Sequence, residues 1–148
     1  MSTFPSEQAA SPAEQITGAR IRLRRRLGWR QTDAAGHNHF SAALEWLEEA
    51  EHSLYRDLGL DVGLLPGIPR VHLCLDYRER LWVDQEVDIE VGVIRVGRSS
   101  LTLAFTVRTL AGSVSVEGTY VIVHSPDPLA GAVPWPEEVA RALASPLA

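Results

Sequence analysis

The chain has 148 residues, of which 45% are hydrophobic and 22% are charged, a composition typical of globular proteins that excludes a wholly disordered chain. Its formal net charge of −5 argues against duplex nucleic acid as a partner, because such binding depends on basic side chains that neutralise phosphates. No apolar run reaches the roughly 18 residues of a membrane span, and the N-terminus lacks the features of a secretory signal, so we expect a cytoplasmic protein with no membrane partner.

The N-terminal part of the sequence predicts a tail followed by a strand. Residues 1–18 are rich in Ser, Ala, Pro, Gln and Glu without any hydrophobic period, which predicts a flexible tail ahead of one domain over residues 19–148. In residues 21–29 apolar and polar side chains alternate, which predicts a half-buried strand. A polar, glycine-containing loop follows over residues 31–38.

The strongest signal for secondary structure is a long helix from His39 to Leu58. Asn38 is a plausible N-cap, and Gly59 is suited to end the helix. Apolar residues recur at the i, i+3, i+4 spacing of one helical face: Phe40, Ala43, Leu44, Leu47, Leu54 and Leu58.

The rest of the chain predicts strands and a short C-terminal helix that extends from residue 134 to Leu143. Alternating patterns mark strands over residues 71–77, 87–96, 101–110 and 114–123, with a bulge expected near Ile94. One long helix over five antiparallel strands is a two-layer α+β domain. The uncovered sheet face and edges predict at least a dimer.

Asp33 lies in the loop that leads into the long helix. The free amides and dipole of a helix N-terminus favour developing negative charge and can polarise a carbonyl, while a nearby carboxylate activates water or attacks. This pairing suits acyl transfer. An aspartate before a helix is also a common capping or turn residue, so the pattern alone leaves both interpretations open.

The same stretch resembles the signature of hotdog-fold acyl-CoA thioesterases of the 4-hydroxybenzoyl-CoA thioesterase type. In that family an Asp-x-x-Gly-His-Val-Asn-Asn loop opens a central helix that often ends in Glu-Glu-Ala. The matching residues here are Asp33, Gly36, His37, His39 and Phe40, followed by Leu44, Glu45, Trp46, Leu47, Glu48, Glu49 and Ala50. Further similarity lies in residues 71–87 and 95–100, and the resemblance covers about residues 20–145.

The resemblance implies a hotdog fold, with a long central helix wrapped by a five-stranded antiparallel sheet. It also implies hydrolysis of an acyl-CoA or acyl-carrier-protein thioester to free acid and thiol, in a homodimer or homotetramer. Coenzyme A would be part of the substrate, with no separate cofactor. Carried over by position, Asp33 matches the catalytic carboxylate and Phe40 matches the residue whose backbone N–H holds the thioester carbonyl. Glu48 is a second candidate, because some family members use a helix carboxylate.

Other candidates concern substrate binding. Gly36, His37 and His39 belong to the loop, and Ala43 stands where the family usually has a helix tyrosine. Arg98 and Ser99, with Arg95 beside them, are candidates for the coenzyme A phosphates in a turn. Asp33, His37 and His39 have ligand chemistry for a transition metal, but we expect no metal there, with His37 bonding the loop and His39 lining a pocket.

Two other functions remain open from the sequence. A non-catalytic hotdog protein would only bind an acyl ligand. Hotdog hydratases or dehydratases usually pair a catalytic Asp or Asn with a His five residues later, but the residue at that distance from Asp33 is Asn38. The single cysteine, Cys74, excludes an internal disulfide and is expected to be a buried, unreactive side chain.

Overall fold

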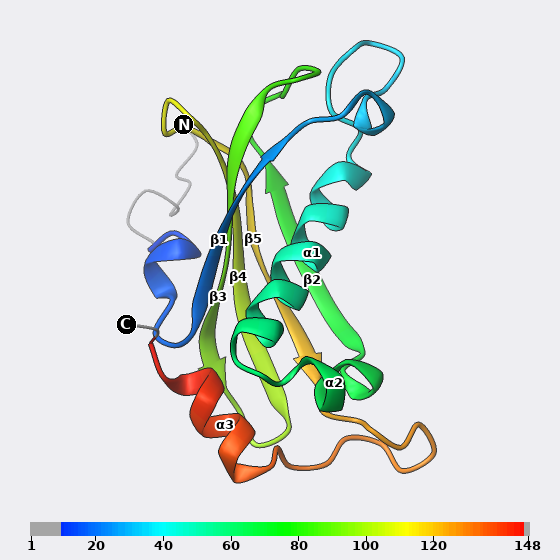
Figure 1. Ribbon diagram of the computed structural model, residues 1–148, viewed down its shortest axis with the longest axis vertical. Coiled ribbons are helices and arrows are strands. Elements are labelled where there is room, and N and C mark those ends of the chain that lie inside the picture. The colour runs from blue at the N-terminus through cyan, green and yellow to red at the C-terminus, as the bar shows by residue number, and fades with distance from the viewer. Residues whose placement is uncertain (1–9, 147–148) are drawn as a thin grey trace, which may run out of the picture.

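Five strands form one antiparallel sheet in the order β1-β3-β4-β5-β2 in the computed structural model, which describes residues 10–146 (Figure 1). The strands are β1 (Arg20–Arg26), β2 (Arg70–Tyr77), β3 (Glu86–Val96), β4 (Ser100–Thr109) and β5 (Val114–Val123). The expected α+β architecture is confirmed. The bulge expected near Ile94 is also confirmed, because the pairing of β3 with β4 shifts between Val93 and Arg95.

A single long helix, α1 (Ser41–Asp57), packs across one face of the sheet (Figure 1). Its start and end each lie within two residues of the expected bounds. The core lies between this helix and the alternate residues of β3, β4 and β5 that face it. The shorter elements are η2 (Ala13–Gln15), η3 (Trp29–Gln31), α2 (Asp61–Leu64), η4 (Leu65–Gly67) and α3 (Glu137–Ala144).

The buried face of α1 differs in part from the predicted one. Phe40 and Leu44 are exposed, because they lie at the rim of the helix rather than against the sheet. The buried face also includes five residues that the predicted spacing did not select: Ala42, Trp46, Ala50, Glu51 and Tyr55. Its members are Ala42, Ala43, Trp46, Leu47, Ala50, Glu51, Leu54 and Tyr55.

Residues 10–18 pack against the sheet and are not the flexible tail that composition predicts. The backbone amides of Thr17 and Gly18 donate hydrogen bonds to the carbonyl oxygen of Val93, at 2.9 and 3.0 Å. A Cβ atom at Gly92 would lie 2.6 Å from the Ile16 side chain, so this glycine permits the close approach. The apolar Ile16, in an otherwise polar segment, explains the docking. Residues 1–9 of the predicted tail lie outside the described residues.

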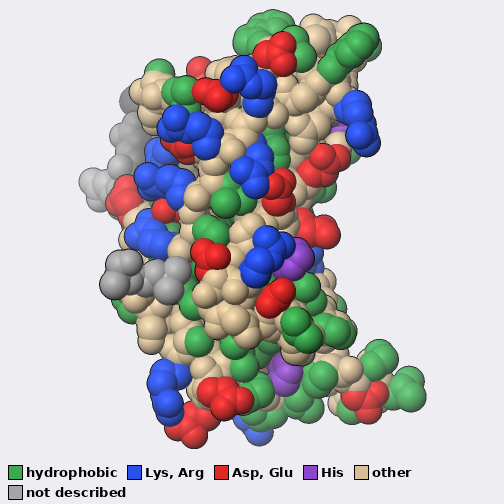
Figure 2. All heavy atoms as spheres, viewed as in Figure 1, with side chains coloured by type: hydrophobic (Ala, Val, Ile, Leu, Met, Phe, Trp, Pro, Cys, Tyr) green, Lys and Arg blue, Asp and Glu red, His purple; other side chains and the backbone are tan. Residues whose placement is uncertain are grey.

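The face of β1 that points away from α1 is charged. The side chains of Arg20 and Arg22 contact Glu90, Arg24 contacts Asp88, and Arg26 contacts Glu86 across the β1–β3 pair. Acidic and basic side chains are therefore interleaved along the β1–β3 pair, rather than gathered into a basic patch. Figure 2 shows a similar mixture of basic and acidic side chains on the face in view.

The edge strand β2 exposes apolar side chains. Val71, Leu73 and Tyr77 all remain exposed, with Leu73 at 42%. Cys74 is also exposed here, which corrects the expectation that it is buried: it lies on an edge strand with no neighbouring strand on one side. An unpaired edge with apolar side chains is suited to pairing with another strand.

Candidate active site

A tight turn holds the Asp33 carboxylate at the start of the loop. The amide of Gly36 donates to the carbonyl oxygen of Asp33 at 3.1 Å, and the amide of Ala35 donates to its Oδ1 at 2.9 Å. Gly36 has a φ of +87°, in the left-handed region that a side chain disfavours. The Asp33 amide then donates to the carbonyl of His37 at 2.8 Å, which closes the loop.

The second half of the loop is tied to the segment between β2 and β3. The amide of Asn38 donates to the carbonyl of Leu81 at 2.9 Å, and the Leu81 amide donates back to Asn38 Oδ1 at 2.8 Å. The expected N-cap role of Asn38 is therefore wrong, because its side-chain oxygen is used by Leu81. The His37 ring packs edge-on against Trp82, with centroids 5.1 Å apart.

Phe40 is the N-cap of α1. The Tyr77 hydroxyl at the end of β2 donates a 2.7 Å hydrogen bond to the Phe40 carbonyl oxygen. The next amide, that of Ser41, donates to His39 Nδ1 at 3.2 Å. Among residues 10–146 the Phe40 amide has no hydrogen-bond acceptor, so this N–H at the positive end of the helix dipole is free to bind an oxygen.

A hollow of about 580 Å³ opens beside these groups. The loop and the N-cap of α1 supply one wall, with Asp33, His37, Asn38, His39 and Phe40. The end of β2 and the following turn supply the other, with Tyr77, Arg78, Glu79 and Arg80. The hollow therefore combines the loop carboxylate of Asp33, the free Phe40 amide, two arginines and a second carboxylate, that of Glu79.

The Asp33 carboxylate stays ionised. Partial desolvation would raise its pKa, but the hydrogen bond from the Ala35 amide and the nearby His37 and His39 together lower the pKa below its usual value. The closest approach of the His37 ring to this carboxylate, from Nδ1 to Oδ2, is 3.5 Å. A carboxylate that remains charged at neutral pH can act as a nucleophile or as a general base.

The structure brings only some of the predicted site residues together. Asp33, His37, His39 and Phe40 line the hollow, and Gly36 shapes the turn that holds Asp33. Ala43 is buried in the core and does not line this hollow. Arg95, Arg98 and Ser99 lie in or next to the β3–β4 turn, at the end of the molecule opposite the loop (Figure 1). Within one chain these three residues are therefore far from Asp33.

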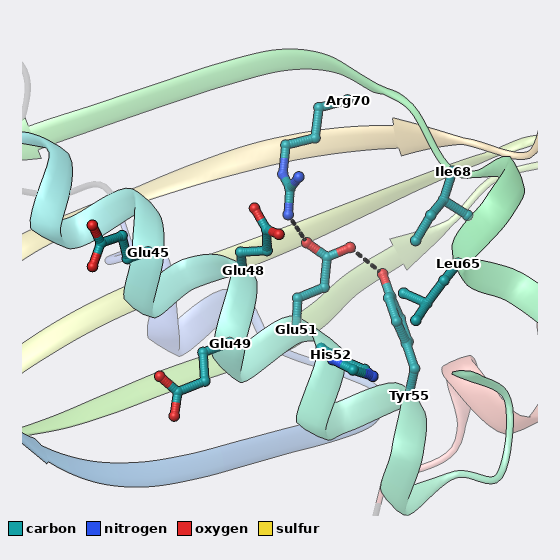
Figure 3. Close-up of a pocket in the computed structure, with 9 residues that line it drawn as sticks. All are labelled: Glu45, Glu48, Glu49, Glu51, His52, Tyr55, Leu65, Ile68 and Arg70. Carbon is teal, nitrogen blue, oxygen red and sulfur yellow. Dashed lines mark hydrogen bonds and ion pairs between the residues drawn. The ribbon is translucent and has the colours of Figure 1, made fainter. Parts of the chain in front are cut away.

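Glu48 lies in a second hollow, of about 620 Å³, between α1 and the start of β2 (Figure 3). This hollow also contains Glu51, whose carboxylate accepts hydrogen bonds from the Tyr55 hydroxyl and the Arg70 guanidinium, both at 2.5 Å. Glu48 itself is exposed on the helix.

Several residues at the two hollows were missed by the sequence analysis. Tyr77, Arg78 and Arg80 had no motif to mark them, because their role depends on how β2 ends beside the helix. Glu51 did carry a signal. It is four residues after Leu47 and four before Tyr55, so a charged residue stands on the buried stripe of the helix.

Neither a metal site nor a membrane span is found in the described part of the chain. No group of three His, Cys, Asp or Glu side chains in residues 10–146 is arranged to hold a metal ion. None of the helices in that range has the length and apolar character that crossing a bilayer requires.

The family model of the thioesterase-like superfamily matches residues 27–143, which includes the loop, α1 and the whole β2–β5 region. The chain belongs to the thioesterase-like superfamily. None of the curated proteins matches it significantly.

Solved structures show the hotdog fold of this superfamily in the same arrangement. A gentisyl-coenzyme A thioesterase is 24% identical, with a TM-score of 0.73 over 84% of this chain and 100% of its own. A 1,4-dihydroxy-2-naphthoyl-CoA thioesterase from Synechocystis is 15% identical, with a TM-score of 0.75 over 84% and 95% of the two chains. A Staphylococcus aureus protein described in complex with CoA is 11% identical, with a TM-score of 0.76 over 90% and 89%. At these identities the likeness establishes the fold alone.

Proposed function

We propose that this protein hydrolyses acyl thioesters of coenzyme A or of a carrier protein, with Asp33 as the catalytic carboxylate. The observation that carries the proposal is the ionised Asp33 carboxylate in the same hollow as the free Phe40 amide at the N-terminus of α1. Membership of the thioesterase-like superfamily supports the reaction class. The named thioesterases among the structures of the same fold point the same way.

In this reaction the thioester carbonyl oxygen accepts a hydrogen bond from the Phe40 amide, which stabilises the oxyanion that forms when the carbonyl carbon is attacked. Asp33 supplies the attack in one of two ways. It removes a proton from a water molecule that adds to the carbonyl carbon, or its own oxygen adds and the resulting anhydride is hydrolysed. Both routes break the carbon–sulfur bond and release the thiol and the free acid.

The hydratase alternative fits the geometry less well. A hydratase of this fold would need a proton-transferring side chain at position 38. The amide oxygen of Asn38 instead accepts a backbone hydrogen bond from Leu81, and an amide does not titrate.

We also propose that the working unit is a homodimer built through β2, or a homotetramer made of two such dimers. This edge strand exposes Val71, Leu73 and Tyr77, and pairing with the β2 of a second copy would cover them. The pairing would also bring the β3–β4 turn of the second copy toward the loop of the first. Arg95, Arg98 and Ser99 would then serve as phosphate contacts for coenzyme A from the partner subunit.

A screen of acyl-CoA substrates with thiol release as the readout tests the proposed activity. The set should span short, medium and long acyl chains and aryl groups, and carrier-protein thioesters of the same acyl groups should be run beside it. We expect turnover of at least one member that is abolished in the Asp33→Asn variant. Binding of acyl-CoA without any thiol release would favour a protein that only binds acyl ligands.

A further inference from the structure

The buried Glu51 carboxylate has no role in the proposed reaction. Its side chain is 3% exposed, and it is held by the Tyr55 hydroxyl and the Arg70 guanidinium. A buried ion pair adds little stability compared with well-packed apolar side chains, because both charges lose their hydration. The position on the buried face of α1 would suit an apolar residue, so stability alone does not explain the carboxylate.

Glu51 fixes the position of Arg70. One terminal nitrogen of the guanidinium bonds Glu51, and its carbon lies 5.6 Å from the centre of the Tyr120 ring. Within residues 10–146 the other guanidinium N–H groups of Arg70 have no hydrogen-bond acceptor, although the side chain lines the hollow. The fully buried Tyr120 hydroxyl also lacks a partner among the described residues. Arg70 is therefore an oriented donor with unused hydrogen-bonding capacity.

The hollow around Arg70 has the size and lining of a ligand pocket. Its volume of about 620 Å³ falls within the range of small-molecule sites, roughly 300–1,000 Å³. Leu65 and Ile68 form an apolar wall, and the side chains of Glu48, Glu51 and Arg70 point into the space between α1 and β2 (Figure 3). The Glu48 carboxylate has no hydrogen-bond or ion-pair partner in the part of the chain that the structure describes.

The direction of β2 relates this hollow to the Asp33 hollow. Arg70 begins the strand and Tyr77 ends it, and both pair with β5 residues, Ile122 and Val116, that face α1. The eight residues of β2 span about 24 Å, too far for a short-chain or aryl acyl group to join the two hollows of a single chain. In the proposed β2–β2 dimer, antiparallel pairing centred on the middle of the strand would place Arg70 beside the partner subunit's Tyr77. The two hollows would then form one site across the interface.

We propose that this hollow binds the acyl group of the thioester held at the partner subunit's Asp33, and that Arg70 and Glu48 select acyl groups that carry a neutral hydroxyl. The inference rests on the proposed thioesterase function. The hydroxyl oxygen accepts a hydrogen bond from Arg70, and its O–H donates a hydrogen bond to the carboxylate of Glu48. Four glutamates and one paired arginine line the hollow, so a carboxylate at the end of the acyl group is repelled. Glu51 is a positioning residue that acts through Arg70.

Matched thioesters test this selection. Octanoyl-CoA, 8-hydroxyoctanoyl-CoA and suberoyl-CoA share one skeleton, and benzoyl-CoA and 4-hydroxybenzoyl-CoA share another. For the wild type we expect kcat/KM to be about tenfold or more higher for each hydroxylated member than for its plain analogue, because a hydrogen bond to a charged group is lost without the hydroxyl. Suberoyl-CoA should be the poorest of its series. Equal values across a series would overturn the proposal.

Substitutions of Arg70 and Glu51 test whether these two residues produce the preference for hydroxylated acyl groups. Arg70→Met should reduce the preference to less than threefold, and Arg70→Lys should keep part of the preference. Glu51→Gln should raise KM for the hydroxylated members without lowering kcat, which a merely structural role would not do. Arg141→Met, on the exposed face of α3, is the matched control. If circular dichroism shows that Glu51→Gln does not fold, the two Arg70 variants alone decide whether the hollow selects hydroxylated acyl groups. A preference unchanged in Arg70→Met would overturn the proposal.

Mixed dimers test the arrangement across the interface. When Arg70→Met is mixed with excess Asp33→Asn, all turnover comes from the Asp33 of the first variant, now facing an intact Arg70 of its partner. The hydroxyl preference should return to the wild-type value. Failure to return would overturn the shared pocket while leaving the thioesterase activity intact.

Binding measurements separate the inference from the function. If the wild type hydrolyses none of the five thioesters, titration calorimetry of the same compounds with the wild type and Arg70→Met still measures the preference. A preference for the hydroxylated members that depends on Arg70 would support the pocket and reject only the reaction. The absence of any such preference in binding would overturn the inference.

Discussion

The Tyr77 hydroxyl donates a 2.7 Å hydrogen bond to the carbonyl oxygen of Phe40, the residue that caps the N-terminus of α1. The amide proposed to hold the thioester oxygen belongs to the same residue. An edge-strand side chain is thus bonded to the end of the helix that carries the proposed oxyanion donor. Partial burial raises the pKa of Tyr77, so its hydroxyl remains a donor at neutral pH.

Tyr77→Phe should therefore lower kcat by about tenfold with little change in KM, because a donor that is slightly misplaced loses its advantage in the transition state. Steady-state kinetics on one acyl-CoA measures the effect. Tyr120→Phe is the matched control, since the Tyr120 hydroxyl has no partner among the described residues. An unchanged kcat in Tyr77→Phe would show that the Phe40 carbonyl needs no anchor.

Gly36→Ala tests the turn that aims Asp33. With φ at +87°, an alanine costs about 1–2 kcal/mol of stability or distorts the turn. We expect a lower melting temperature and a reduced kcat. Gly63→Ala is the control, because a Cβ there meets no atom within 4 Å and the residue has no positive φ. Equal melting temperatures and rates in both variants would mean that the turn tolerates a side chain.

The acid limb of the pH–rate profile reports the Asp33 carboxylate. Because its pKa is lowered in the folded protein, activity that needs the ionised form is lost only as the pH falls through a value below the usual range of an aspartate. Removing His37 takes away part of the lowering, so His37→Asn should move the acid limb to higher pH. The ionised Asp33 also contributes to the stability of the fold, and this contribution is likewise lost as the pH falls through the lowered pKa. An acid limb that does not move, or moves down, would contradict this.

A charge on the β2 edge should break the proposed dimer. Leu73→Arg places like charges near the two-fold axis of a β2–β2 pair, where like charges across strands are destabilising. Sedimentation velocity should show a dimer or tetramer for the wild type and a monomer with little activity for the variant. Val62→Arg, on an 88% exposed side chain of α2, should leave the assembly unchanged. A fully active Leu73→Arg monomer would contradict a site shared between subunits.

The periodicity of apolar residues was sufficient to predict the helix and sheet layers of the fold, but not the contacts within the candidate site. The strands over residues 71–77 and 114–123 and the helix before Gly59 were predictable, because their apolar residues repeat with the period of each element. The position of Asp33 beside the start of α1 was predictable, because the loop and the helix start are adjacent in the sequence. Tyr77 and Arg70 were not, because each meets its partner on α1 only after the sheet has formed. The docking of Ile16 was missed for the same reason.

The role of Asn38 shows how a local rule fails. A capping preference is a statement about neighbours in sequence, and Asn38 stands at a suitable position for it. The structure instead uses its side-chain oxygen for the amide of Leu81, which lies 43 residues away. The distance of Arg98 from Asp33 could not be predicted from the sequence either. Because the two residues are far apart within one chain, the proposed phosphate contact of Arg98 depends on a second copy.

The most direct test compares kcat of Asp33→Asn with kcat of Glu48→Gln on one well-hydrolysed acyl-CoA without a hydroxyl, with circular dichroism to confirm both folds. Asp33→Asn keeps the shape of the side chain but removes the basic oxygen, so we expect kcat to fall by about 10²–10⁴ or more. Glu48→Gln should retain most of the wild-type kcat, since the proposed contact of Glu48 is with an acyl hydroxyl that this substrate lacks. If Glu48→Gln abolishes turnover and Asp33→Asn spares it, the catalytic carboxylate lies on α1 and the assignment to Asp33 is wrong.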